Sequence, residues 1–419
     1  MEELKDGWRR VKLGEVCEII FSGGTPNTKI SEYWNGNINW LSSGETRHRY
    51  IKTTEKKITK NGVENSSTKL ALKNDVVVAS AGQGFTRGQT SYCLINTYIN
   101  QSVISLRSNF KVIDSKYLFF NIISRYNELR HLSDGNASRG SLTTKIMKDL
   151  DIFLPPLETQ EKIASILSAL DDKIEINNEM NKTLEEMAQT LFKRWFIDFD
   201  FPNENGEPYR SSGGKMVDSE LGEIPEGWEI EKLSKIIEIN PKESLKKGEK
   251  SIYVEMKSLS ENSSIISNYI VRNFTGSGTK FKNRDTLMAR ITPCLENGKT
   301  GFINFLDNEI TAWGSTEFNV LRSKKNIPKE LSYFIARDQS FRKYAIGNMN
   351  GSSGRQRISG KILEEYKLAI ANDFNLYQRF GFVISKLMDK IENNRKEIKS
   401  LTETRDTLLP KLMSGEVEV

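Results

Sequence analysis

Long apolar runs, cysteine and histidine are all scarce in this chain of 419 residues, and each scarcity excludes a class of protein. No apolar run approaches the roughly 18 residues that a membrane-spanning helix needs, so we expect no membrane partner. Residues 1–15 contain no apolar core of a secretion signal. Cys17, Cys93 and Cys294 lie far apart and, with only two histidines, give no spacing typical of a zinc site. These features predict a reduced, cytoplasmic protein without a metal site.

Motifs for catalysis or cofactor binding are also missing. Neither GxxxxGKS nor GxxxxGKT is present, which argues against ATP hydrolysis. Gly82, Gly84 and Gly88 have the spacing GxGxxxG rather than the GxGxxG of a dinucleotide loop, and Arg87 lies among them. The proline pair at 155–156 is flanked by leucines, not by the polar and aromatic residues of an amino-methyltransferase loop. We therefore predict a non-catalytic chain without a cofactor.

What the sequence does contain is a long heptad pattern over residues 154–196. Apolar residues recur there at alternating steps of four and three, the pattern of a helix that packs lengthwise against another helix. At 1.5 Å per residue such a helix would be roughly 55 Å long. The predicted seam contains Leu167, Leu170, Ile174, Asn177, Leu184 and Leu191.

A second copy of this pattern occupies the end of the chain, displaced by 217 residues. Its predicted seam contains Ile384, Leu387, Ile391, Asn394, Ile398, Leu401 and Leu408. Asn177 and Asn394 fall at the same level, and a buried asparagine fixes the register of a helix pair at a cost in stability. We hypothesise that the two helices pair with each other. The alternative is two separate helices, each packed on its own domain.

The segments before the two helices also resemble each other. GWRRVKLGEVCEI at 7–19 returns as GWEIEKLSKIIEI at 227–239. Predicted strands at 75–81 and 285–291 are each followed by a glycine-containing polar loop with a basic residue. Further on, a Gly/Ser loop bearing arginine precedes a short helix and a strand in both halves. This loop suits contacts with phosphates or bases, or it serves as the cap of the following helix.

These repeats predict an α+β fold in which two similar mixed α/β domains are joined by two long helices forming a coiled coil. The predicted parts are a first domain (1–155), a central helix (156–200), a linker (201–226), a second domain (227–372) and a distal helix with a tail (373–419). Gly, Pro, Ser and charged residues mark the linker.

The net charge of +6 is unevenly distributed. Residues 1–154 carry 22 basic against 15 acidic residues, and 201–371 carry 26 against 22, whereas 155–200 carry 5 against 10. The positive charge therefore belongs to the two domains, which fits two modules facing a polyanion. Ordinary lysine-rich surface is the alternative explanation.

Three stretches resemble the specificity subunit of type I restriction–modification systems: LPPLETQEKIA at 154–164, LDDKIE at 170–175 and GEIPEGWE at 222–229. The resemblance covers nearly the whole chain, together with the order of domain, helix, domain, helix. One departure is 371–378, where ANDFNLYQ replaces the proline-containing start of the first helix.

The resemblance implies that both are target-recognition domains, each of which reads one half of a split, asymmetric site in double-stranded DNA. It implies that the two long helices are antiparallel and set the spacing. It also implies docking of methyltransferase subunits, expected in two copies, which bind S-adenosylmethionine and methylate adenine. A motor-nuclease subunit would complete the restriction enzyme. This chain itself would hold no cofactor.

On that basis we expect the DNA contacts to come from basic and amide side chains on the domain loops. In the first domain these are Arg47, Arg49, Gln83, Arg87, Gln89, Arg139 and Lys145. In the second they are Lys257, Arg290, Lys299, Arg355, Gln356 and Arg357.

Two other functions remain open at this point. A solitary two-module DNA-binding adaptor or regulator would need no methyltransferase, and a stand-alone methyltransferase would need motifs that are missing. The aromatic residues Phe192, Trp195 and Phe196 at the end of the first helix would form part of a docking surface, or they pack on the adjacent domain.

Overall fold

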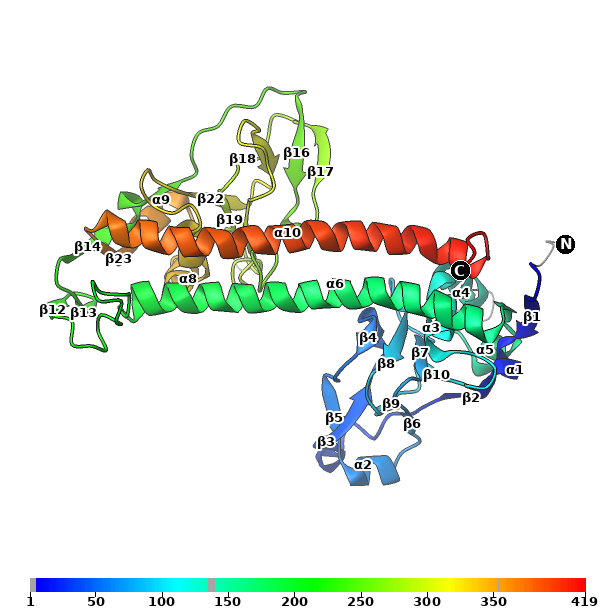
Figure 1. Ribbon diagram of the computed structural model, residues 1–419. Helices are drawn as coiled ribbons and strands as arrows, with labels where there is room; N and C mark the ends of the chain where they lie inside the picture. Colours follow the sequence, from blue (N-terminus) through cyan, green and yellow to red (C-terminus); the bar gives the residue numbers. More distant parts are fainter. Residues whose placement is uncertain (1–4, 135–139, 353) are drawn as a thin grey trace. The chain divides into compact units, whose positions relative to one another are not determined.

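The computed structural model describes residues 5–134, 140–352 and 354–419. The chain forms two compact units: unit 1 comprises Met1–Ile174 with Ser400–Val419, and unit 2 comprises Glu175–Lys399. Each unit contains strands, short helices and a segment of each of two long helices (Figure 1). Within the described ranges, no helix has the length and apolar character needed to cross a membrane.

Unit 1 is built on two sheets and a two-stranded ladder. The five-stranded sheet has the order β2 (Cys17–Ser22), β10 (Val103–Ser108), β7 (Val76–Ala79), β8 (Thr90–Cys93), β4 (Tyr50–Ile51). The four-stranded sheet has the order β5 (Lys56–Ile58), β3 (Trp34–Leu41), β9 (Thr97–Ile99), β6 (Lys69–Ala71). The ladder pairs β1 (Arg9–Lys12) with β11 (Asp151–Leu154). The short helices are α1 (Leu13–Val16), α2 (Lys60–Glu64), α3 (Ser115–Ser124), α4 (Tyr126–Asp134) and α5 (Thr144–Asp149).

The core of unit 1 lies between the five-stranded sheet and α3. β7 and β8 are buried along their whole length, as expected for central strands rich in β-branched and small residues. α3 begins where the side chain of Asp114 accepts a hydrogen bond from the backbone N–H of Tyr117 at 2.8 Å. Its buried Phe119 and Phe120 complete the core.

Unit 2 repeats this plan. One four-stranded sheet has the order β15 (Ile237–Ile239), β22 (Phe318–Ser323), β19 (Thr286–Ala289), β20 (Thr300–Phe302). The other has the order β17 (Ile270–Asn273), β16 (Lys250–Val254), β21 (Ala312–Gly314), β18 (Thr279–Phe281). β14 (Trp228–Lys232) pairs with β23 (Lys367–Ala371), and β12 (Met216–Ser219) with β13 (Gly222–Pro225). The short helices are α7 (Leu331–Arg337), α8 (Gln339–Gly347) and α9 (Gly360–Glu364).

The two units share strand pairings, not only sequence patterns. β10 lies between β2 and β7 as β22 lies between β15 and β19, and all four pairings are antiparallel. Within the four-stranded sheet of each unit, the parallel pairing of β3 with β9 has its counterpart in β16 with β21. The predicted internal repeat is therefore confirmed at the level of topology.

The long helices are α6 (Leu157–Phe192), which ends in a π-helical turn at Lys193–Ile197, and α10 (Phe374–Met413). In unit 1 the first part of α6 packs with the last part of α10, and Leu167 shares a core with Leu412. In unit 2 the last part of α6 packs with the first part of α10, where Phe192 lies against Phe380. The helices are thus antiparallel in each unit (Figure 1), and the α+β fold prediction is confirmed.

The predicted seam residues differ in their burial. Those that are buried are Leu167, Ile174, Asn177, Ile384, Ile391 and Asn394. Those that are half-buried are Leu170, Leu184, Leu191, Leu387, Ile398, Leu401 and Leu408. Asn394 donates to Asn181 Oδ1 at 2.8 Å, whereas Asn177 donates to Glu397 Oε2 at 2.9 Å. The two asparagines at equivalent levels therefore make different bonds.

The aromatic residues at the end of α6 pack inside unit 2. Phe192, Trp195 and Phe196 are buried and belong to the same core as Trp228 and Phe380. Their rings contact each other and Phe380 at centroid separations of 4.9–6.5 Å. Of the two explanations offered for this cluster, packing on the adjacent domain is the one the structure supports.

Candidate nucleic-acid interface

The loop between β7 and β8 carries three of the predicted contact residues of unit 1. It closes on the end of β7, because Gly88 N donates to Ala79 O and Ala79 N donates to Gln89 O, both at 2.9 Å. Gln83 is exposed and Gln89 half-buried, but Arg87 is only 8% exposed and forms an ion pair with Asp134. The loop therefore offers amide side chains to solvent, while its guanidinium group is held inside.

The Gly/Ser loop before α5 reaches the same edge of the sheet. Leu142 N donates to Ser80 O at 2.9 Å, immediately after β7. Thr143 caps α5 by accepting from Ile146 N at 3.1 Å, and Lys145 is exposed on this helix. Arg139 lies outside the described residues. The described part of this loop thus forms one surface with the β7–β8 loop. Its Thr143 also caps α5, so both functions suggested by the sequence are compatible with the structure.

Arg47 and Arg49 come from the segment between β3 and β4 and have different surroundings. Arg47 ends the 3₁₀ turn η2 (Ser43–Arg47), is exposed and pairs with Glu55. Arg49 Nε donates to Asp171 Oδ2 on α6 at 2.6 Å, and its guanidinium carbon lies 5.4 Å from the ring centre of Phe119. Arg49 therefore fastens the sheet to the helix pair within unit 1.

In unit 2 the structure brings Arg290, Gln356 and Arg357 together. Arg290 follows β19, and its carbonyl accepts from Ile358 N at 2.9 Å. Gln356 N donates to Thr292 Oγ1 at 3.2 Å. Arg357 makes a bidentate pair with the carboxylate of Glu317, with Nη2 to Oε1 at 2.7 Å and Nε to Oε2 at 2.9 Å. Three separate chain segments thus form one polar surface.

The electrostatics of this surface depend on Glu317. The hydrogen bond from Arg357, followed by the positive charges of Arg357 and Arg290, holds the pKa of Glu317 below its usual value of 4.5. Arg290 is half-buried, and its Nε has no hydrogen-bond partner within the described ranges. A ligand with acceptor atoms would meet two guanidinium groups here, only one of which has a full carboxylate partner.

The remaining predicted residues of unit 2 lie on neighbouring turns. Lys299 is half-buried at the end of the β19–β20 loop, where its carbonyl accepts from Ala289 N at 3.0 Å. Arg355 is exposed beside Gln356. Lys257 is exposed on η5 (Met256–Ser258) and pairs with Glu255 at 2.6 Å. Exposed ion pairs of this kind are worth about 0–1 kcal/mol, so a phosphate can displace the carboxylate.

Two buried carboxylates on α6 bind the long helix to the rest of each unit, and sequence reasoning missed both. In unit 1, Asp171 accepts from Arg49, from Tyr50 Oη at 2.7 Å and from Arg405 Nη1 at 2.8 Å. In unit 2, Glu185 accepts from Tyr333 Oη at 2.5 Å and from Ser264 Oγ at 2.7 Å. The only sequence signal was an acidic residue beside the apolar seam, which solvated helix surfaces share.

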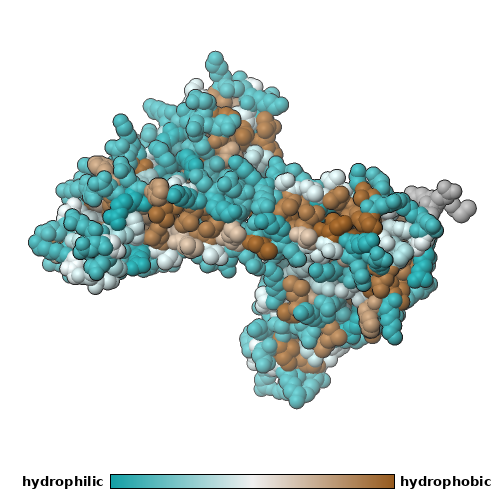
Figure 2. Space-filling model, viewed as in Figure 1, coloured by the Kyte–Doolittle hydropathy of each residue, from teal (hydrophilic) through white to brown (hydrophobic). Residues whose placement is uncertain are grey.

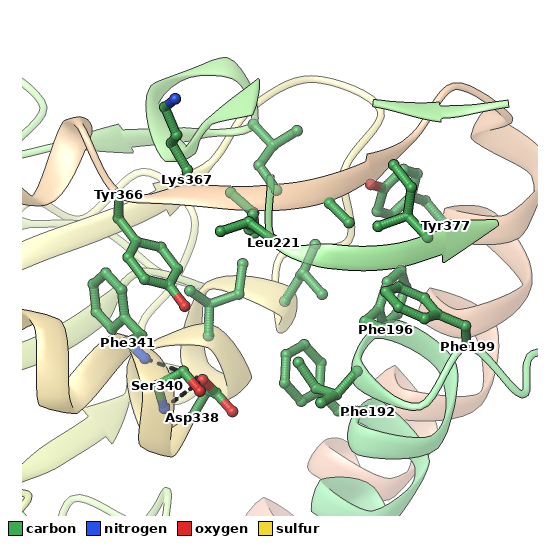
Figure 3. Close-up of a pocket in the computed structure, with 17 residues that line it drawn as sticks. Phe192, Phe196, Phe199, Leu221, Asp338, Ser340, Phe341, Tyr366, Lys367 and Tyr377 are labelled. Atoms are coloured by element: carbon green, nitrogen blue, oxygen red, sulfur yellow. Dashed lines mark hydrogen bonds between the residues drawn. The ribbon is translucent and has the colours of Figure 1, made fainter. Parts of the chain in front are cut away.

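Unit 2 also contains an apolar cavity of about 440 Å³ near the end of α6 (Figure 3). Phe192, Phe196 and Phe199 form one wall, and Tyr366 with Phe341 lines the opposite side. Asp338 points into it but is engaged in capping α8, where it accepts from Ser340 N at 2.9 Å. The lining of this cavity is mainly apolar, and Asp338 uses Oδ1 to cap α8.

Two modules of similar topology present basic and amide side chains on loops at a sheet edge, and each module contains a segment of both long helices. This arrangement defines a protein that recognises nucleic acid through two modules.

The comparisons with known proteins identify the family. Residues 5–186 and 225–403 match the type I restriction modification DNA specificity domain, so this domain occurs twice. The specificity subunit of the MjaIX type I restriction enzyme of Methanocaldococcus jannaschii is 27% identical, covering 98% of this chain and 94% of that protein. The HindI specificity subunit of Haemophilus influenzae is 21% identical over 98% of this chain and 99% of its own.

Among solved structures, the type I S subunit from M. genitalium has the same fold, with a TM-score of 0.59 at 16% identity, covering 98% and 97% of the two chains. The chain belongs to the type I restriction–modification DNA specificity family and is a specificity subunit. The resemblance noted in the sequence is thereby confirmed, and the solitary adaptor is not favoured.

Proposed function

We propose that the recognition domains at 1–155 and 227–372 each read one half of a split, asymmetric site in double-stranded DNA. The observation that carries this proposal is that the two domains share a strand framework but have different residues in the loops. An offset of 210 residues aligns Ala79 with Ala289 and Gly88 with Gly298, and both glycines have positive φ. In this alignment GQGFTRG at 82–88 corresponds to TPCLENG at 292–298. Equal frames with unequal loops suit two readers of different sequences.

The proposed contacts fall into two kinds. Exposed cations such as Arg47, Lys145, Lys257 and Arg355 suit phosphates, which position a module without reading sequence. Amide and guanidinium groups in the loop surfaces suit base edges: Gln83, Gln89, Arg290, Gln356 and Arg357. Arg49 would have to leave the buried carboxylate of Asp171 to touch DNA, and Arg87 is itself buried beside Asp134, so we assign both to supporting roles.

We also propose that the helix pair sets the separation of the two half-sites and docks methyltransferase subunits that modify adenine. Ile176, Met180 and Met187 are exposed on α6 at spacings of four and seven residues, which places them on one helix face. Phe382 and Val383 are exposed on α10 in the same unit. Apolar surface is visible over the two helices of unit 2 in Figure 2. Exposed apolar stripes of this kind mark protein interfaces.

The internal repeat supports two methyltransferase copies, because each half of the chain supplies one helix and one domain. A motor-nuclease subunit would join them in the restriction complex.

The experiment is sequencing of DNA from cells that express this chain with its candidate methyltransferase, scored for N6-methyladenine. We expect two short blocks around a fixed unspecified gap, and loss of the motif when this chain is deleted. Replacing one recognition domain should change one block only. A single continuous motif, or a motif that persists without this chain, would contradict the proposal.

A second test addresses the unit 2 surface. Arg290→Ala should weaken specific binding by about 1–3 kcal/mol if the guanidinium group contacts a base. Lys257→Ala is the comparison for a phosphate contact, which should weaken binding to all sequences and reduce its salt dependence. Unchanged affinity of the Arg290→Ala complex at fixed salt would remove Arg290 from the interface.

A further inference from the structure

Phe85 is the most exposed large apolar side chain of the described residues. It lies in the β7–β8 loop of unit 1 with 81% of its surface exposed. A phenylalanine ring in water gives up the stabilisation that its burial in a core would provide. The exposure of this ring therefore suggests that it contacts a binding partner.

The loop that carries Phe85 is held rigidly by its backbone. The carbonyl of Phe85 accepts from Tyr126 Oη at 2.8 Å, and that of Gly84 accepts from Arg130 Nη1 at 2.5 Å; both donors come from α4. Gln89 N donates to Thr86 O at 3.0 Å. The peptide groups of the loop are thus hydrogen-bonded to α4, so the backbone that carries the exposed ring is held in place.

The strand framework that the two units share does not require an exposed apolar residue in this loop. The offset of 210 residues that aligns Ala79 with Ala289 places Phe85 opposite Leu295 in unit 2. Leu295 is only 1% exposed and belongs to the unit 2 core. A loop on this frame can therefore bury its apolar residue, and unit 1 exposes its own.

The neighbours of Phe85 define what the ring would meet. Gln83 is exposed two residues earlier, and an amide can pair with both N6 and N7 of adenine. The ring itself can make no conventional hydrogen bond. In the major groove of DNA the one apolar group is the 5-methyl of thymine.

We propose that Phe85 contacts the 5-methyl group of a thymine in the half-site read by unit 1. This inference rests on the proposed function and adds one base-reading residue to it. The ring recognises thymine by burying its methyl group, and cytosine, which has a hydrogen there, leaves the ring without a partner.

The test compares thymine with deoxyuridine, which lacks only the methyl group. The full chain, in complex with its methyltransferase, is titrated by fluorescence anisotropy with duplexes in which each thymine of the half-site is replaced in turn. One replacement should weaken wild-type binding about fourfold, since one buried methyl is worth about 0.8 kcal/mol. Phe85→Ala should weaken binding to the thymine duplex by at least as much, and the deoxyuridine replacement should then add nothing.

The matched control is Phe110→Ala. Phe110 is 72% exposed and follows the carboxyl end of β10, which runs antiparallel to β7, so it leaves the sheet at the opposite edge from Phe85. Phe110→Ala should keep wild-type affinity and full sensitivity to deoxyuridine. Phe85→Leu retains an apolar side chain, should keep part of that sensitivity, and carries the test if Phe85→Ala fails to fold.

Three results would overturn the inference. They are wild-type binding that is insensitive to deoxyuridine at every position, wild-type affinity in Phe85→Ala, and equal deoxyuridine losses in Phe85→Ala and wild type. The first of these, combined with weak binding of Phe85→Ala, would indicate a ring inserted between base pairs. A wild-type complex that does not prefer its target over a scrambled duplex is a different failure, and it removes the proposed function as well.

Discussion

The buried carboxylate of Asp171 is expected to carry a large part of the stability of unit 1. It is 1% exposed and joins three donors, Arg49 and Tyr50 from the sheet side and Arg405 from α10. Burial and then the charge of Asp171 raise the pKa of Tyr50, so its hydroxyl stays protonated and donates. In Asp171→Ala both arginines lose this carboxylate, and Arg405 keeps its pair with the exposed Asp406.

Removing one partner of a buried ion pair costs about 3–5 kcal/mol, because the other charge remains uncompensated. Arg405 has 11% and Arg49 23% of its side chain exposed, so neither regains full hydration in the folded state. We expect the slowest-exchanging amides of unit 1 to exchange roughly 10²- to 10⁴-fold faster, with those of unit 2 unchanged. Native-state hydrogen exchange measures both units in one sample.

Asp172→Ala is the matched control, since Asp172 is an exposed neighbour on the same helix turn. This variant should change the free energy of opening of the unit 1 amides by less than about 0.5 kcal/mol. Adding Arg405→Met should cost less in Asp171→Ala than in wild type, because the two residues act as a pair. A loss in Asp171→Ala no larger than that of Asp172→Ala would refute the reasoning.

Three further predictions follow from groups in unit 2 and unit 1. Glu185→Ala should lower the free energy of opening of the unit 2 amides by about 3 kcal/mol, because the hydroxyl of Tyr333 loses a buried acceptor. Glu186→Ala, at an exposed position, should leave this free energy unchanged, and native-state hydrogen exchange measures both variants. Arg357 lowers the pKa of Glu317 in the folded chain, so this pair stabilises the fold at pH values above the unfolded pKa of 4.5. The stabilisation is lost as the pH falls through the lower folded pKa. In Glu317→Gln the melting temperature should therefore fall less steeply with decreasing pH, as thermal unfolding measures. Burial raises the pKa of Cys17 to about 12, so alkylation at pH 8 should be slow in the native chain and fast in urea, as peptide mass spectrometry can show.

The sequence predicted the long helices well because their signal is local. A 3.5-residue period needs only neighbouring residues, and the 217-residue offset exposed the second copy. The roles of Asp171 and Glu185 were not predictable in this way. Their partners Tyr50 and Tyr333 lie 121 and 148 residues away, and only the tertiary fold brings them together.

The candidate site was predictable in part for the same reason. The sequence placed Arg290 and Arg357 on glycine-containing loops, and the fold joins those loops in one surface. It could not show that Arg49 and Arg87 turn inward, since an arginine has the same local pattern whether it faces solvent or a distant carboxylate. Phe85 was missed because one exposed ring leaves no periodic signal.

The two-stranded ladders at the base of each domain have a consequence for evolution. In unit 1, β1 enters and β11 leaves side by side, with Arg9 opposite Leu154 and Lys12 opposite Asp151. In unit 2, β14 and β23 do the same, with Trp228 opposite Ala371 and Lys232 opposite Lys367. Everything between the paired strands can therefore be exchanged by recombination as one cassette, without moving the points where the chain joins the helices. A gene of this design can acquire a new domain by exchange of one bounded segment, while the codons of the two long helices stay unchanged.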